Sequence, residues 1–166
     1  KPTDMVVMDN KLTTWKNLEM KSDAYDAYLK LYRAAKKKGF SLKVCSAYRT
    51  YSTQKTLYAN AVKTKGRKTA NIRSARAGRS EHHTGYAIDI TSKSMGWGLK
   101  QDFADYPDGK WINDHCHEYG FIIRYPKGKT DITGYAYEPW HLRYVGVEAA
   151  TEIMEQDITL EEYLGR

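Results

Sequence analysis

Hydrophobic and polar positions recur along this chain with two different periods, which predict helices and strands in turn. Between Ser22 and Lys38 apolar side chains return every three or four residues, as on a helix with one buried face. Ser22 or Asp23 is expected to cap this helix, and Gly39 to end it. Its buried face is expected to comprise Tyr25, Tyr28, Leu29, Tyr32 and Ala35.

Shorter segments alternate apolar and polar residues with a period of two and predict strands. These strands are expected over 40–45, 86–91, 121–125 and 140–144. In the second of them, Asp89 falls on the face opposite Ile88 and Ile90, so Asp89 can line a site while the isoleucines enter the core. In the last, His141 falls on the face opposite Trp140.

Further helical patterns complete the expected fold. They are expected over 52–65 with Leu57, Tyr58, Ala61 and Val62 inward, over 110–119, over 146–156, and after a capping box at Thr159–Glu162. Helices and strands mix without a regular βαβ rhythm, which predicts an α+β fold with a central antiparallel sheet and flanking helices. The whole chain, 1–166, is expected to be one domain, with an irregular segment over residues 1–20.

Charge is unevenly distributed around a formal net value of +7. The segment 63–79 contains seven Lys and Arg residues, no acidic residue and no clear period, so we expect a long loop there. Such a basic stretch can attract nucleic acid, anionic membranes or anionic cell-wall polymers, and the alternative is an ordinary solvated loop. No apolar run approaches the ~20 residues of a membrane-spanning helix.

The two cysteines, Cys45 and Cys116, are too few for a disulfide-dense scaffold and too widely spaced for a zinc motif. Their spacing leaves both a single bridge and two buried thiols open. Outside the cell a bridge would be chemically permitted.

Two short segments contain the chemically most suggestive residues, Ser80–Asp89 and Glu138–His141. His82, Asp89 and His141 are a plausible three-ligand set for a divalent zinc ion, with a fourth position left for water, as in catalytic sites. Glu138 stands where a general base for that water is needed. Arg49 follows the strand expected over 40–45 and is the candidate for stabilising an oxyanion or a substrate carboxylate. Arg49 is equally interpretable as an ion-pair partner of Glu138 or Asp89.

Other residues near these segments have structural interpretations. His83 competes with His82 as a ligand, while His115 and His117 are expected to be surface or packing residues, because positions two apart on a helix face different ways. Ser80 is also interpretable as a turn residue and Trp140 as a core residue.

The motif Ser80-x-His82-x-x-Gly85-x-Ala87-x-Asp89, followed by Glu138-x-Trp140-His141, resembles the signature of the zinc D-Ala-D-Ala metallopeptidases. The resemblance is closest to the VanY-type D,D-carboxypeptidases and the related L,D-carboxypeptidases of bacterial cell walls. Supporting matches over 46–50 with Gln54, over 119–126 and over 138–146 extend it across roughly residues 40–146.

This resemblance implies a hedgehog/D-Ala-D-Ala-peptidase-like fold with one catalytic zinc ion in a cleft on the sheet. It implies zinc ligands at His82, Asp89 and His141, and the motif spacing favours His82 over His83. It also implies that Glu138 is the catalytic base, that Arg49 binds or polarises the substrate, that Gln54 and Ser80 lie near the C-terminal D-alanine, and that Trp140 lines the site. Thr50 departs from the family, in which serine usually follows the arginine.

The expected function is therefore zinc-dependent D,D-carboxypeptidase action, which removes the terminal D-alanine from peptidoglycan stem peptides. L,D-carboxypeptidase action on tetrapeptide stems and endopeptidase action are the alternatives within the same chemistry. A non-catalytic cell-wall binding module is the alternative of another class, and a nucleic-acid-binding module based on 63–79 is a more remote one, so no nucleic acid is expected as a partner. We expect a monomer on the extracellular face of a bacterial cell, secreted or anchored through a segment not present here, with anionic wall polymers as a second partner.

Overall fold

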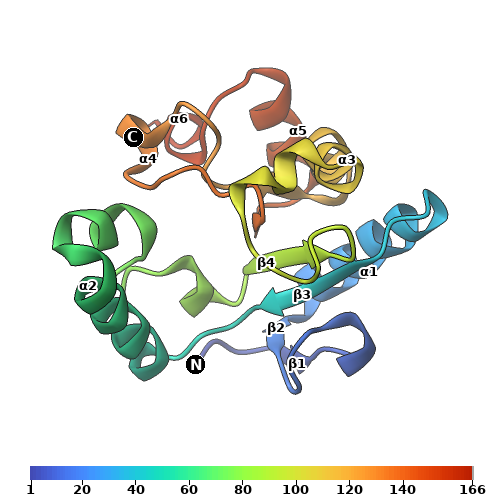
Figure 1. The fold of residues 1–166 in the computed structure, drawn as a ribbon. Helices are drawn as coiled ribbons and strands as arrows, with labels where there is room; N and C mark the ends of the chain where they lie inside the picture. Colours follow the sequence, from blue (N-terminus) through green and yellow to red (C-terminus); the bar gives the residue numbers. More distant parts are fainter. Residues whose placement is uncertain (166) are drawn as a thin grey trace.

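Four strands form an antiparallel sheet in the order β3-β4-β6-β5 in the computed structural model, which describes residues 1–165 (Figure 1). The strands are β3 (Leu42–Ser46), β4 (Ala87–Ser92), β6 (His141–Tyr144) and β5 (Phe121–Ile123). The α+β fold with a central antiparallel sheet is thus confirmed. Every residue of β4 is buried, because β4 lies between two neighbouring strands and helices cover the sheet.

The register of the sheet brings distant polar residues together. Asp89 of β4 pairs with His141 of β6, so residues 52 positions apart become direct cross-strand neighbours. On the other side of β4, a β-bulge at Cys45 makes Ser46 the partner of Asp89. Bulges re-aim side chains next to functional sites.

Helix α1 (Ser22–Lys37) contributes the largest part of the core outside the sheet. Its buried residues are Ala24, Ala27, Tyr28, Leu31 and Ala35, whereas the expected Tyr25, Leu29 and Tyr32 are partly buried at the edges of that face. Ile88 and Ile90 belong to the same core cluster, as predicted.

The remaining elements cover the sheet and its ends. They are η1 (Asn10–Leu12), η2 (Glu81–Thr84), η3 (Gln101–Asp105), α3 (Pro107–His115), η4 (Cys116–Tyr119), α4 (Thr130–Thr133), α5 (Val147–Glu155) and α6 (Leu160–Tyr163). The predicted capping box at Thr159 and Glu162 begins α6.

The expected irregular segment over residues 1–20 contains two short strands. β1 (Met5–Val7) pairs antiparallel with β2 (Glu19–Lys21), and the side chains of Met8 and Met20 are buried. A strand of three residues is too short for its alternation to be visible in the sequence, which explains the error.

Helix α2 spans Tyr51–Arg73. The prediction of a long loop over 63–79 is therefore wrong for residues 63–73, which are helical. Gly66 interrupts the helix with φ 76° and ψ 156°, so the helix expected over 52–65 continues past residue 65 after a kink. The expected inward residue Leu57 is 42% exposed. The helix buries only Gln54 and Ala70, so its sequence lacks the apolar stripe by which helices are recognised. Figure 1 shows α2 at one side of the sheet.

Cys45 and Cys116 are both free thiols, so the bridge that the sequence left open is not formed. No helix within residues 1–165 is both long enough and apolar enough to cross a membrane.

Gly109 offers a test of the packing between α3 and η3. A Cβ atom at Gly109 would lie 1.8 Å from the carbonyl oxygen of Phe103, a backbone atom that cannot rotate away. We expect Gly109→Ala to lower the free energy of unfolding by about 3 kcal/mol, the upper end of the usual cost of overpacking. Urea denaturation measures this. Gly98→Ala, whose nearest contact is 3.4 Å away, is the control and should change stability by no more than about 0.5 kcal/mol. Equal effects of the two substitutions would contradict this packing.

Candidate metal centre

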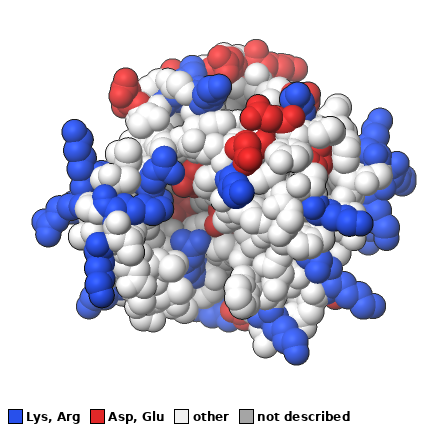
Figure 2. Space-filling view, viewed as in Figure 1, with Lys and Arg blue, Asp and Glu red and all other residues white. Residues whose placement is uncertain are grey.

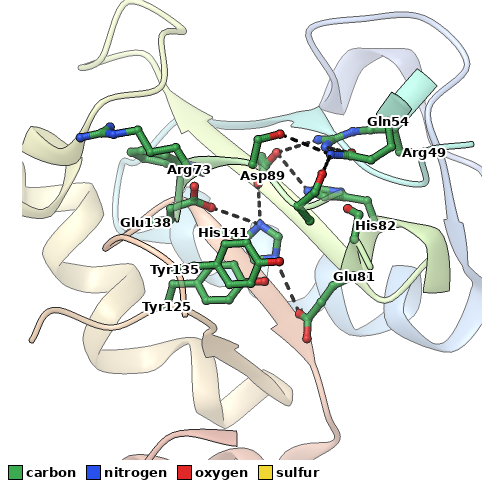
Figure 3. A pocket seen from close by; sticks show the side chains of 14 residues that line it. Arg49, Gln54, Arg73, Glu81, His82, Asp89, Tyr125, Tyr135, Glu138 and His141 are labelled. Carbon is green, nitrogen blue, oxygen red and sulfur yellow. Dashed lines mark hydrogen bonds and ion pairs between the residues drawn. The ribbon is translucent and has the colours of Figure 1, made fainter. Parts of the chain in front are cut away.

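His82, Asp89 and His141 converge on one point of the sheet. One ligand atom from each residue lies within 4.8 Å of the other two, and all three residues are buried. His82 comes from η2, Asp89 from β4 and His141 from the start of β6, so three separate segments supply the cluster (Figure 3). The structure therefore brings together the three ligands expected from the sequence.

The ring of His82 is oriented by the backbone. Its Nδ1 lies 2.7 Å from the carbonyl oxygen of Ala47, to which it donates, so the lone pair of Nε2 faces Asp89 Oδ2 at 3.3 Å. Burial lowers the pKa of His82, which keeps this lone pair free at neutral pH. Both ring nitrogens of His83 instead bond to backbone atoms, Nδ1 donating to Arg49 O and Nε2 accepting from Gly78 N. The geometry thus selects His82 over His83.

Asp89 and His141 form the centre of the cluster. His141 Nδ1 lies 3.0 Å from Asp89 Oδ1. Burial opposes ionisation of Asp89, but His82 and His141 outweigh it and hold the pKa of Asp89 well below its usual range. Burial would lower the pKa of His141, but the neighbouring carboxylates of Asp89 and Glu81 raise that pKa to about 9. The cluster thus attracts positive charge, and two imidazoles with one carboxylate are a donor set that suits zinc.

Glu138 lies beside the cluster, its Oε2 3.7 Å from Nδ1 of His141. Backbone hydrogen bonds from Glu138 N to Tyr125 O and from His141 N to Glu138 O fix the turn that positions its side chain. Burial raises the pKa of Glu138 to about 7. A carboxyl group with such a pKa can both accept and return a proton near neutral pH, as a general base must.

Arg49 reaches the same cluster from beyond the bulge in β3. Its guanidinium donates to Gln54 Oε1 at 2.7 Å and to Ser46 Oγ at 2.7 Å, and it lies 3.4 Å from Asp89 Oδ2. The ion pair with Asp89, which was an alternative interpretation of Arg49, is therefore formed. Arg49 also lines the cleft, so its pairing with Asp89 does not withdraw it from the site.

An open cleft of about 230 Å³ contains the cluster. It is lined by Arg49, Gln54, Arg73, Ser74, Ala75, Ser80, Glu81, His82, Asp89, Tyr125, Tyr135, Glu138, Trp140 and His141. Every site residue expected from the sequence is among them. Trp140 both lines the cleft and packs against the core, so it is at once a site residue and a core residue.

His115 and His117 lie outside the cluster, as expected. His115 pairs with Glu118 at 2.7 Å, and His117 borders a separate apolar groove.

Sequence reasoning missed Glu81, which is partly buried next to His82. Burial opposes its ionisation, but His141, Arg124 and Arg143 lower the pKa of Glu81 to about 2. The sequence feature that could have indicated Glu81 is Arg124. It follows the apolar strand β5, and a buried arginine needs a carboxylate partner.

Comparisons with known proteins agree with this geometry. A family model described as VanY, D-alanyl-D-alanine carboxypeptidase, matches residues 17–147. The chain is 47% identical over 165 residues to a protein of Bacillus subtilis (strain 168) named putative carboxypeptidase YodJ. That match covers 98% of this chain and 60% of the relative, so the chain spans about three fifths of the relative's length.

Two solved structures extend the likeness to three dimensions. The LdcB LD-carboxypeptidase is 46% identical with a TM-score of 0.92, covering 99% of this chain and 78% of that one. A mutant of the vancomycin-resistance D,D-pentapeptidase VanY from a VanB-type cassette, in complex with Zn(II), is 31% identical with a TM-score of 0.84, covering 98% and 90%. Both likenesses confirm the fold expected from the motifs.

Zinc titration tests the metal centre. We expect the metal-free protein to bind one zinc ion and to unfold at a higher temperature when loaded, because the ion binds the folded state. His141→Ala should weaken zinc affinity by more than about 100-fold, beyond the range for outer-shell changes. Competition with a chromophoric chelator measures the affinity. His115→Ala is the matched control and should leave it within about twofold. Equal loss in both variants would exclude His141 as a ligand.

Proposed function

Because the chain belongs to the VanY D-alanyl-D-alanine carboxypeptidase family, we propose that it is a zinc-dependent carboxypeptidase acting on peptidoglycan stem peptides. In this proposal it hydrolyses the bond to the C-terminal D-alanine. The observation that carries the proposal is the buried cluster of His82, Asp89 and His141, with Glu138 beside it in an open cleft. The Zn(II) complex of the similar VanY structure supports zinc as the ion.

The side chains divide the chemistry among them. A zinc ion held by the cluster would polarise the substrate carbonyl and make a water molecule more acidic. Glu138 accepts the proton of the attacking water and returns it to the amine of the departing D-alanine. The guanidinium of Arg49 stabilises negative charge on the substrate, and its bonds to Ser46 and Gln54 hold it in place before the substrate arrives.

The buried end of the cleft is suited to the terminal D-alanine. Ser80 is buried there, and Gln54 is held by Arg49 on one side and by the carbonyl oxygen of Ala75 on the other. In the proposal Ser80 and Gln54 surround the small D-alanine side chain and its carboxylate.

Two specificities share this centre, and each has an observation in its favour. The family model and the VanY structure favour D,D-carboxypeptidase action on a pentapeptide. The identity of 46% to the LD-carboxypeptidase LdcB, against 31% to VanY, favours L,D-carboxypeptidase action on a tetrapeptide. The complete ligand set with Glu138 argues against a non-catalytic binding module.

Defined peptides with mass readout test this proposal. A pentapeptide ending in D-Ala-D-Ala should yield a tetrapeptide and one alanine. Conversion of a tetrapeptide substrate into a tripeptide would reveal L,D action. A chelator should abolish turnover and added zinc should restore it. Glu138→Gln should lower kcat by about 10²–10⁴-fold while zinc affinity is retained, because only the base is lost. Glu155→Gln, an exposed change, is the control. No product from any of these peptides with zinc restored would refute the proposal.

We propose further that the protein acts outside the cell and that its basic surface contacts anionic cell-wall polymers. This basic surface comprises Lys63, Lys65, Arg67, Lys68, Arg73, Arg76 and Arg79. Within residues 1–165, none of these side chains forms an ion pair with a carboxylate, so their charge is available to a partner. Figure 2 shows Lys and Arg gathered on the side where α2 lies, beside a hollow with acidic side chains.

Charge reversal tests the basic surface. Lys63→Glu, Lys65→Glu and Arg67→Glu together should weaken sedimentation with isolated cell walls at least about tenfold at low salt. Binding by the parent protein should fall as salt rises, since screening shortens the reach of exposed charges. Turnover of a soluble peptide should not change. The same reversal at Lys36, Lys37 and Lys38, exposed at the end of α1, is the charge-matched control. Equal loss in both variants, or binding to DNA in preference to walls, would contradict a dedicated wall-polymer surface.

A further inference from the structure

Two buried polar atoms face each other behind the metal centre. Glu81 Oε2 and His141 Nε2 are both buried and have no hydrogen-bond partner, and they lie 3.8 Å apart. One is an acceptor and the other can be a donor, so a movement of about 1 Å would create a hydrogen bond of ordinary length. Leaving two such atoms unpaired away from water is unfavourable, because neither regains the hydrogen bond that it would make to water. Figure 3 shows Glu81 on the side of His141 away from Asp89.

The imidazole of His141 has to present a particular tautomer to the cluster. Its Nδ1 faces Asp89 Oδ1 at 3.0 Å and Glu138 Oε2 at 3.7 Å, so Nδ1 is the nitrogen available to an ion. Coordination requires a lone pair on Nδ1, which places the proton on Nε2. A carboxylate next to Nε2 fixes that tautomer and the ring orientation.

Glu81 is itself held from the opposite side. Its Oε1 accepts from Arg124 Nε at 2.8 Å and lies 3.0 Å from Arg143 NH1, which leaves Oε2 for His141. Arg124 extends its two terminal nitrogens to Glu161, with bonds of 2.9 and 2.6 Å. Bidentate pairs of this kind fix geometry as well as charge. Since Arg124 is buried, Glu81 and Glu161 together compensate its charge.

This chain of contacts extends beyond the residues that the family model matches. Glu161 lies in α6, whereas the family model ends at residue 147. A contact from α6 thus reaches a metal ligand through Arg124 and Glu81, with no step longer than 3.8 Å.

We propose that Glu81 is a positioning residue that holds His141 in its Nε2–H tautomer, and that the Arg124–Glu161 pair fixes Glu81 from α6. The inference rests on the metal site of the proposed function, and it adds α6 to the elements on which metal affinity depends.

Two measurements on the purified protein test this inference. Long-range ¹H–¹⁵N spectra of the zinc-loaded protein report the Nε2–H proton of His141, and competition with a chromophoric chelator reports zinc affinity. In the parent protein we expect this proton to be hydrogen-bonded and slow to exchange with solvent. In Glu81→Ala the proton should exchange at least about tenfold faster, and zinc affinity should fall 10–100-fold, as for other partners of ligating histidines. Glu81→Gln keeps an acceptor of the same shape and should rescue most of both, and it remains informative where the alanine variant is poorly folded.

Glu161→Gln tests the connection to α6. Glu161→Gln should lower zinc affinity by about 3–10-fold, a smaller loss than that expected for Glu81→Ala. Glu162→Gln is the matched control, since Glu162 is the exposed neighbour and glutamine preserves its capping interaction. We expect its zinc affinity to equal that of the parent.

The outcomes separate this inference from the proposed function. An Nε2–H proton that exchanges as slowly in Glu81→Ala as in the parent, with zinc affinity within twofold, would overturn the role of Glu81. Equal affinities of the Glu161→Gln and Glu162→Gln proteins would overturn the role of α6. Loss of peptide turnover without a change in Nε2–H exchange or zinc affinity would count against the proposed function alone, because both readouts are independent of substrate.

Discussion

The buried carboxylate of Asp89 is the constraint on which the site depends. A carboxylate withdrawn from water is costly unless donors or cations surround it, and Asp89 is only 6% exposed. His82, His141 and Arg49 provide that surrounding from three other segments of the chain. Cross-strand pairing with His141 and the bulge that makes Ser46 the partner of Asp89 make this convergence a property of the sheet itself. An ion at the cluster would replace repulsion between neighbouring donors with shared coordination, so folding and metal binding favour the same arrangement.

Backbone hydrogen bonds hold the side chains of the centre in fixed orientations. The carbonyl oxygen of Ala47 fixes the ring of His82, and the turn at Glu138 is closed by hydrogen bonds at both of its ends. Sites whose ligands are fixed by such neighbours keep their geometry without the ion. Glu81 fits this arrangement, because it meets the one nitrogen of His141 that the cluster does not use.

The sequence predicted the features that leave a local signature. Helix α1 and the strands have clear periods, and the site residues His82, Asp89, His141 and Glu138 occur in two short motifs. Helix α2 left no period because it buries so few side chains, and the three-residue strands β1 and β2 were too short to show one. The network of Glu81, Arg124 and Glu161 was also beyond prediction, because it joins residues 37 and 43 positions apart that no motif links.

Specificity is best sought in the walls of the cleft, because the metal centre is common to every reaction considered for this chain. One wall comes from the end of α2, where Arg73, Ser74 and Ala75 line the cleft. The other comes from the segment with Tyr135 and Trp140. A backbone hydrogen bond from Ala136 N to Ile72 O joins the two walls at 2.8 Å, so the width of the cleft is set by the same contact that anchors α2. Helix α2 is otherwise sparsely buried, and substitutions along it can therefore alter the cleft without disturbing the ligands. The proposed discrimination between a pentapeptide and a tetrapeptide is therefore expected to depend on these walls and not on the centre around Asp89.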